Sequence, residues 1–270
     1  MAPRKDLTVH RAVICDDRAH VHACELGGIG VHGRGTPHAL HAANGKWLTA
    51  DEVRKAMHTT MDYHRPVTTI VSLENTIAGE VHPIDEIRKI EQVAREHGCI
   101  MHLDGARLWN ACAATDLKLS DFGQIFDSMS LCLSKGLGAP IGSVLVGSKD
   151  FIHQGRQLRK AFGGGMRQTG ILAAACLYAV EHHWPLMKQD HVRTQKLGAG
   201  LQALGFEMRI SDTNQVWFKD PAAFKPFLEP LREAGFVTNE SRLVCHHQTT
   251  DEDVDALLAT LGELVAKHKA

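Results

Sequence analysis

The amino-acid sequence predicts an α/β fold in which a mostly parallel, mixed sheet is sandwiched between helices and followed by a small α+β domain. Through the first two thirds of the chain, short β-branched runs alternate with segments of helical periodicity, a pattern typical of parallel sheets with helical crossovers. After Pro185 the pattern changes to helices and short strands in close succession. We therefore expect residues 1–184 to form a large domain and residues 185–270 a small C-terminal domain.

Five apolar segments predict the strands of the large domain, because they are short, rich in β-branched residues and bounded by polar residues or glycine. They are residues 11–15, 67–73, 99–103, 127–133 and 142–147. A helix is expected from about Thr49, since Thr49-Ala-Asp-Glu52 has the form of a capping box. Another is expected over 84–97, where isoleucine and valine recur at helical spacing.

The sequence after residue 147 predicts mainly helices. Residues 148–183 have helical character that Gly163-Gly164-Gly165 interrupts, because three glycines are too flexible for a helix interior. In the small domain we expect a helix to about residue 204, two short strands, a second helix, a third strand and a final helix. The two strands are expected within residues 206–218, the second helix over 222–234, the third strand over 242–246 and the final helix over 251–267.

Composition excludes several classes of protein. Hydrophobic residues make up 44% of the 270 residues and the formal net charge is −1, so no basic field indicates a nucleic-acid partner. No stretch approaches the ~20 apolar residues of a membrane span, and no signal-peptide core follows the first methionine. The seven cysteines form no C-x-x-C pair, which favours free thiols in a reducing compartment. We expect a cytoplasmic protein without membrane or nucleic-acid partners.

Two polar residues directly follow predicted strands. Lys135 lies between an apolar strand and a glycine-rich turn, where a partly desolvated amine can lose its proton and attack an aldehyde. Asp104 is expected at the carboxyl edge of the sheet, where open α/β sheets bind ligands. From these residues alone other interpretations stay open: Lys135 as a solvated loop charge, and Asp104 as a helix cap paired with Arg107.

Three long segments carry a resemblance to a known family. They are residues 102–111 (HLDGARLWNA), 130–149 (SLCLSKGLGAPIGSVLVGSK) and 159–170 (RKAFGGGMRQTG). They resemble the threonine aldolases, which are pyridoxal-phosphate enzymes of the aspartate-aminotransferase fold (fold type I). Shorter stretches keep the order of this family: residues 17–22, 71–76 and 241–244. The resemblance spans about residues 11–260 and implies pyridoxal 5'-phosphate as the cofactor.

The resemblance assigns a role in cofactor binding to each of five residues. Lys135 would form the Schiff base with pyridoxal phosphate, and Asp104 would pair with the pyridine nitrogen. Arg107 would neighbour the phenolic oxygen, and His20 would stack on the pyridine ring. Arg167, after the glycine run, would approach the phosphate, across a subunit interface in one arrangement.

The substrate side of the site is implied in the same way. Arg242 would grip the substrate carboxylate, a bidentate task that suits a guanidinium group. His20 and His22 form an H-x-H pair, but two histidines on one strand do not make a metal site, so we expect no metal. The family's reaction is the cleavage of threonine or allo-threonine to glycine and an aldehyde.

Two departures from the family keep alternative functions open. Many relatives carry a histidine that recognises the substrate hydroxyl where this chain has Ile77, so stereochemical preference and the choice between an aldolase and an alanine racemase or β-eliminating lyase stay open. Relatives also carry a preceding segment with a Ser-Gly-Thr type loop that holds the cofactor phosphate. We expect the large domain to lack this part, so a truncated, inactive homologue is a third hypothesis. With that segment present, the family implies a homodimer or homotetramer acting on a small amino-acid substrate.

Overall fold

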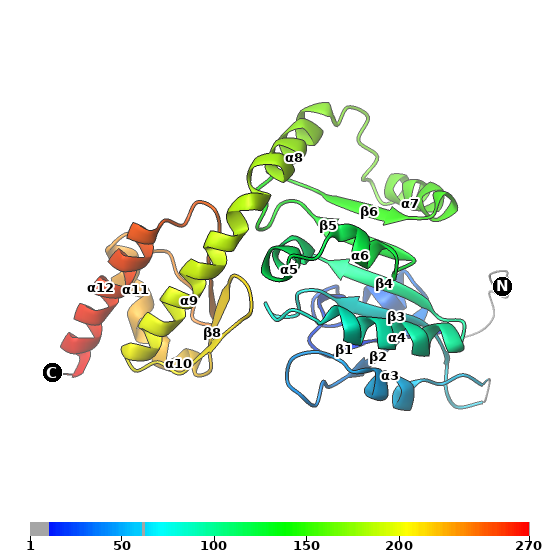
Figure 1. Cartoon of the computed structure of the whole chain (residues 1–270), viewed down its shortest axis with the longest axis horizontal. Coiled ribbons are helices and arrows are strands. Elements are labelled where there is room, and N and C mark those ends of the chain that lie inside the picture. Colours follow the sequence, from blue (N-terminus) through cyan, green and yellow to red (C-terminus); the bar gives the residue numbers. More distant parts are fainter. Residues whose placement is uncertain (1–10, 61–62, 270) are drawn as a thin grey trace.

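The computed structural model describes residues 11–60 and 63–269, and its centre is a six-stranded sheet (Figure 1). The strand order is β2-β1-β3-β4-β5-β6, and every neighbouring pair is parallel except β5 and β6. The strands are β1 Arg11–Asp16, β2 Gly35–Leu40, β3 Val67–Glu74, β4 Ile100–Gly105, β5 Ser128–Cys132 and β6 Ser143–Gly147. The predicted mostly parallel mixed sheet, flanked by helices, is confirmed.

Helices flank this sheet, and several begin where the sequence indicates. They are α1 His20–Ala23, α2 Gly28–Val31, α3 Ala50–Ala56, α4 Ile84–Glu96, α5 Leu108–Thr115, α6 Leu119–Gly123, α7 Lys149–Ala161 and α8 Gly170–His182. The predicted capping box starts α3: the Glu52 N–H donates to the Thr49 hydroxyl at 3.3 Å and the Thr49 N–H to the Glu52 carboxylate at 2.7 Å. The glycine run separates α7 from α8, as predicted.

An apolar core joins the sheet to its helices. Met101 and Leu103 of β4 are fully buried and pack in one cluster with Ile87 and Ile90 of α4. Because the isoleucines recur at helical spacing, they form the stripe by which α4 is attached to the sheet. Because β1, β3, β4 and β5 pair in parallel, their carboxyl ends meet at one edge of the sheet.

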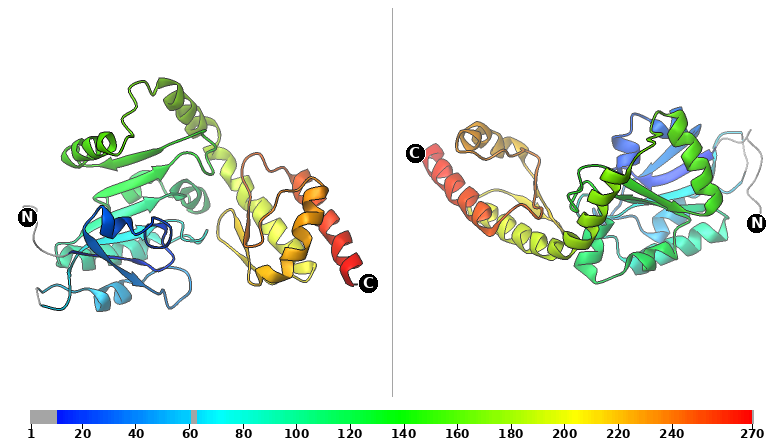
Figure 2. Two further views of the ribbon diagram at one scale, coloured as in Figure 1. Left: turned by 180° about the vertical axis from the view of Figure 1, so that it is seen from behind. Right: turned by 90° about the horizontal axis from the view of Figure 1, so that it is seen from above.

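The chain after residue 186 forms a second, antiparallel sheet with its own core (Figure 2). Its elements are α9 Met187–Ala203, β7 Met208–Ile210, β8 Gln215–Phe218, α10 Pro221–Phe224, α11 Leu228–Glu233, β9 Arg242–Val244 and α12 Asp251–Lys269. Four phenylalanines stack edge-to-face or in parallel at the centre of this core, at positions 206, 218, 224 and 227. Short 3₁₀ turns cover Trp184–Leu186 and Lys225–Phe227. The domain boundary between residues 184 and 185 stays a prediction.

Two elements differ from the sequence prediction. The helix expected over 222–234 is broken into α10, a 3₁₀ turn and α11, because Pro226 lacks the N–H that a continuous helix needs. Strand β2 was not predicted, because Pro37 lies within it. Proline is tolerated in β2 since this strand is at the end of the sheet and pairs with β1 alone.

The second sheet holds the loop 75–82 that follows β3. The Trp217 indole N–H donates to the carbonyl of Ala78 at 3.0 Å, and the Thr213 hydroxyl donates to the carbonyl of Gly79 at 2.8 Å. Residues of the C-terminal part of the chain thus hold in place a loop at the carboxyl edge of the large sheet. Within the described ranges, no helix combines the length and the apolar character needed to cross a membrane.

Candidate active site

Acidic residues lie at the carboxyl ends of two adjacent strands, β3 and β4. Glu74 is the last residue of β3 and lies opposite Asp104 of β4 in the strand register, and Asp104 lies opposite Ser130 of β5. The chain leaves β5 toward Lys135. The predicted meeting of Asp104 and Lys135 at one edge therefore agrees with the observed strand order, and this edge is where open α/β sheets bind ligands.

Asp104 is half-buried and tied to the backbone that follows it. One oxygen, Oδ1, accepts the Ala106 N–H at 3.0 Å. This bond fixes the carboxylate beside the turn that leads into α5.

Arg107, which precedes α5, and Arg242, the first residue of β9, lie close enough for their charges to interact. Burial, and next the positive charge of Arg242, lower the pKa of the Arg107 guanidinium. The Arg107 Nε atom is buried and has no hydrogen-bond partner among the described residues. Arg242 is exposed and its guanidinium lies over the Trp217 ring, 5.1 Å from the ring centroid. Two like charges beside an unpartnered donor suit a negatively charged ligand.

The turn that carries Lys135 is held rigidly while the lysine itself is exposed. The Gly138 N–H donates to the Lys135 carbonyl at 2.8 Å, and Gly138 has a positive φ of 69° that glycine tolerates best. The ring of His247 fills the space that a side chain at 138 would need. His183 stacks on His247 with 4.2 Å between ring centroids, and its Nδ1 lies 2.6 Å from the Leu137 carbonyl oxygen.

His20 opens helix α1 above the same edge. Its backbone N–H donates to Glu74 Oε2 at 2.8 Å, and its ring Nδ1 lies 2.5 Å from Glu25 Oε1. Burial, followed by the charge of Asp104, raises the pKa of Glu74 to about 7, although the His20 N–H, the His20 ring and Lys135 oppose this rise. The prediction from sequence missed Glu74 as a site residue; its position at the end of an apolar strand was the available signal.

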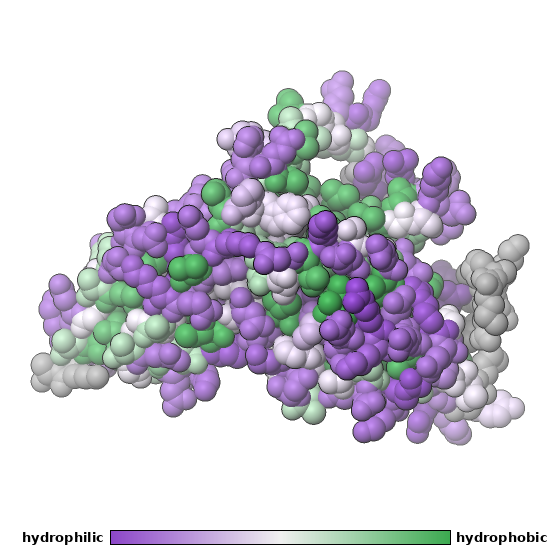
Figure 3. Space-filling model, in the orientation of Figure 1, coloured by the Kyte–Doolittle hydropathy of each residue, from purple (hydrophilic) through white to green (hydrophobic). Residues whose placement is uncertain are grey.

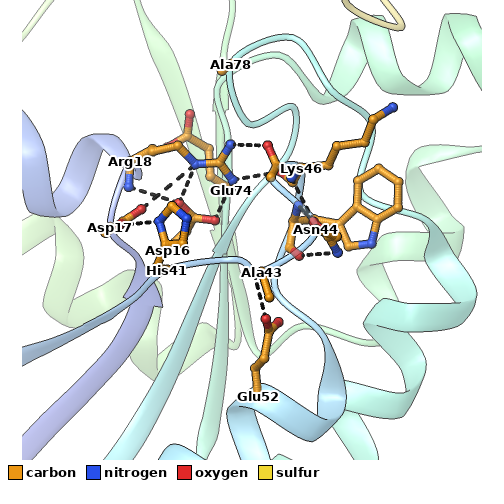
Figure 4. Close-up of polar contacts among 12 residues, drawn as sticks. Asp16, Asp17, Arg18, His41, Ala43, Asn44, Lys46, Glu52, Glu74 and Ala78 are labelled. Carbon is orange, nitrogen blue, oxygen red and sulfur yellow. Dashed lines mark hydrogen bonds and ion pairs between the residues drawn. The ribbon is translucent and has the colours of Figure 1, made fainter.

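A network of charged residues supports the neighbouring end of β1 (Figure 4). The Arg18 guanidinium donates to both Asp16 oxygens, at 2.9 and 2.8 Å, and to the carbonyls of Gly45 and Lys46, each at 2.8 Å. It thereby ties β1 to the loop before α3, beside the side chain of Glu74 in the same view.

A small pocket opens between this network and the loop after β3. Its lining residues are Asp16, Trp47, Leu48, Leu73, Glu74, Ile77 and His82. Ile77 is buried and contributes an apolar side chain to the lining of this pocket. Burial lowers the pKa of His82 to about 4, which keeps this histidine neutral at physiological pH.

One predicted site residue, Arg167, is not brought to the site by any contact among the described residues. Arg167 is exposed in the loop between α7 and α8, and in the part of the chain that the structure describes it has no hydrogen bond or ion pair with the site residues. His22 is exposed on α1, and over residues 11–60 and 63–269 no group of three potential metal ligands gathers. The geometry gathers Lys135, Asp104 and Arg242, together with His20 and Arg107, and adds Glu74 to them.

Comparisons with known proteins show what the chain is similar to. The β-eliminating lyase family model matches residues 6–220. A probable low-specificity L-threonine aldolase of Schizosaccharomyces pombe is 37% identical over 257 residues, which are 95% of this chain and 68% of that protein. An alanine racemase of Cochliobolus carbonum is 32% identical over 265 residues, covering 94% of this chain and 68% of the racemase.

A solved structure shows the same fold. The threonine aldolase of Leishmania major superimposes with a TM-score of 0.78 at 23% identity, over 94% of this chain and 78% of that one. The chain thus spans about two thirds to four fifths of the proteins that it matches.

Proposed function

Because the chain belongs to the β-eliminating lyase family and, within it, to the threonine aldolases, we propose that it cleaves threonine-like β-hydroxy amino acids to glycine and an aldehyde. The family is pyridoxal-phosphate-dependent, so the cofactor is pyridoxal 5'-phosphate. The observation that carries the proposal is the convergence of Lys135, Asp104 and the pair Arg107–Arg242 at one sheet edge.

The residues at this edge suit the cofactor. The exposed Lys135 amine would hold the cofactor aldehyde covalently, and the Asp104 carboxylate would keep a proton on the pyridine nitrogen. The unpartnered Nε of Arg107 would bind an anionic oxygen, and the His20 ring would cover one ring face. When bound, the cofactor supplies a sink for the electrons that remain on the substrate Cα after bond cleavage. Arg167, which makes no contact with the site, stays a weaker candidate for the phosphate.

Replacing Arg242 by alanine is expected to raise KM for the amino acid about tenfold to a hundredfold, because a charge-assisted hydrogen bond contributes ~1.5–3 kcal/mol. Steady-state kinetics with a matched Arg232→Ala control, an exposed arginine of α11, measures the effect. Arg242→Lys should recover part of the loss, since lysine keeps the charge without the two-pronged geometry. An unchanged KM in Arg242→Ala would remove Arg242 from the substrate site.

Product analysis separates the aldolase from its nearest alternative. Protein loaded with pyridoxal phosphate is incubated with L-threonine, L-allo-threonine and L-alanine, and acetaldehyde, glycine and D-alanine are measured. The proposal expects acetaldehyde and glycine in equal amounts. The similarity to an alanine racemase and the buried Ile77 support racemisation as the second candidate. Conversion of alanine without release of acetaldehyde would exclude the aldolase.

We also propose a cytoplasmic location and a homo-oligomer. All seven cysteines are free thiols, which suits a reducing compartment. Exposed apolar side chains gather on β6, α7 and α8, at Ile141, Val144, Leu145, Leu158, Phe162, Ile171 and Leu177. Figure 3 shows hydrophobic residues among these upper segments of the molecule. Exposed apolar side chains of this kind support association with another copy.

A further inference from the structure

We propose that Glu74 is a positioning residue of this site: it takes up a proton and so adds no second negative charge beside Asp104, and it fixes the first turn of α1, which carries His20. The roles of Asp104 and His20 toward the cofactor rest on the proposed function. The placement and protonation of Glu74 do not, since they follow from the fold alone.

The strand register places two carboxyl groups side by side. Glu74 and Asp104 are partners across β3 and β4, so their side chains leave the same face of the sheet, and neighbouring strands are only ~4.8 Å apart. The pairing continues beyond the strand, because the Asn75 N–H donates to the Asp104 carbonyl at 2.9 Å. Two carboxylates at this separation repel each other, so one of them favours the protonated form.

Burial raises the pKa of Glu74 to about 7 and is the largest cause of this shift, and the charge of Asp104 raises it further. The charged groups around it are His20 from α1, Asp104 from β4, Lys135 after β5 and Arg107 before α5. Asp104 accepts the Ala106 N–H through Oδ1, which holds its carboxylate beside Glu74.

The second role of Glu74 is mechanical. Its Oε2 atom accepts the His20 N–H at 2.8 Å, and this N–H is one of the first in α1, where no partner exists within the helix. The other contact of His20, its ring pair with Glu25, is to a residue just after α1 and does not connect His20 to the sheet. The hydrogen bond between the His20 N–H and Glu74 therefore ties His20 to the end of β3.

Variants separate the two roles. Glu74→Gln keeps an acceptor oxygen for the His20 N–H but cannot ionise, whereas Glu74→Ala removes both properties. Glu86→Gln is the matched control, because Glu86 also accepts a backbone N–H at the start of a helix, from Ala50 at 2.9 Å. Burial raises the pKa of Glu86, but the Ala50 N–H and Lys89 outweigh it and the net shift is downward, opposite to that of Glu74.

The first measurement is the melting temperature of cofactor-free protein between about pH 5 and pH 8. A carboxyl with a pKa raised in the folded chain stabilises the fold below its usual value of 4.5 and loses that contribution as pH rises through 7. Glu74→Gln should therefore gain several degrees over the parent protein on going from pH 5 to pH 8. Glu86→Gln should instead differ from the parent by a nearly constant amount between pH 5 and pH 8, because the pKa of Glu86 is lowered and its contribution is complete above 4.5. The proton assignment is overturned if Glu74→Gln tracks the parent at every pH.

The second measurement is the visible spectrum of the protein with pyridoxal phosphate. The parent should show a transition near pH 7 that Glu74→Gln lacks while it keeps the band, since ionisation of Glu74 adds a charge beside Lys135. Glu74→Ala should bind the cofactor about tenfold more weakly than Glu74→Gln, because the anchor of His20 is lost. Equal binding by the two variants would overturn the anchoring role. A missing band in every protein would instead contradict the proposed function, and the melting temperatures would still decide the state of Glu74.

Discussion

Replacing Lys135 by alanine is expected to abolish the visible absorption band that the purified protein develops with pyridoxal phosphate, and with it all turnover. The band reports the covalent link between an amine and the cofactor aldehyde, and alanine offers no amine. Lys135 is the exposed lysine on the rigid turn that follows β5. The measurement is a titration with cofactor followed by absorbance.

The matched control is Lys149→Ala. Lys149 is also exposed and also follows an apolar strand, β6, but it begins α7 and lies outside the site. It should retain the band at full intensity. If the parent protein develops no band with excess cofactor, the active-enzyme hypothesis fails and the inactive homologue takes its place. If Lys135→Ala keeps the band, a different lysine holds the cofactor.

Replacing Asp104 by asparagine is expected to lower kcat by about a hundredfold or more while the absorption band of the bound cofactor persists. The amide has the same shape and still accepts the Ala106 N–H, so the local backbone should not change. What is lost is the negative charge that keeps the ring nitrogen protonated, and charge-assisted hydrogen bonds are about twice as strong as neutral ones. Steady-state kinetics and the spectrum are recorded on the same sample.

A surface carboxylate provides the control for Asp104. Asp85→Asn removes one negative charge from the first turn of α4, away from the site, and should leave kcat unchanged. A kcat of Asp104→Asn within a factor of about three of the parent would contradict the assigned role, since a lost ionic partner should cost more. Loss of the band together with activity would indicate a failure of cofactor binding rather than of catalysis.

The fold was largely predictable because its signals are local. Each predicted strand of the large sheet is found, since short β-branched runs between polar residues have few other structures available. The capping box at Thr49 and the glycine break before α8 follow from the chemistry of a few adjacent residues. Strand β2 escaped prediction, because what makes Pro37 acceptable is its place on the outermost strand, a property of the assembled sheet.

Part of the site was predictable for the same reason. Lys135 and Asp104 each follow an apolar strand, and parallel strands bring their carboxyl ends to one edge, so order along the chain sufficed to place them together. The closeness of Arg107 to Arg242 was not predictable from spacing, because it depends on how the second sheet packs against the first. The family resemblance implied the roles of Arg107 and Arg242, whereas only the structure revealed that the Nε atom of Arg107 is buried without a hydrogen-bond partner among the described residues.

The sequence by itself determined the α/β fold, the family and the lysine that would hold the cofactor, because strand propensity and motif order are written in adjacent residues. Only the tertiary structure decided the environment of Glu74, which depends on the register with Asp104 and on burial beneath α1. It also decided that Trp217 and Thr213 hold the loop after β3. Register, burial and contacts across the two sheets arise when distant segments meet, and these interactions set the charge and position of the side chains at the site.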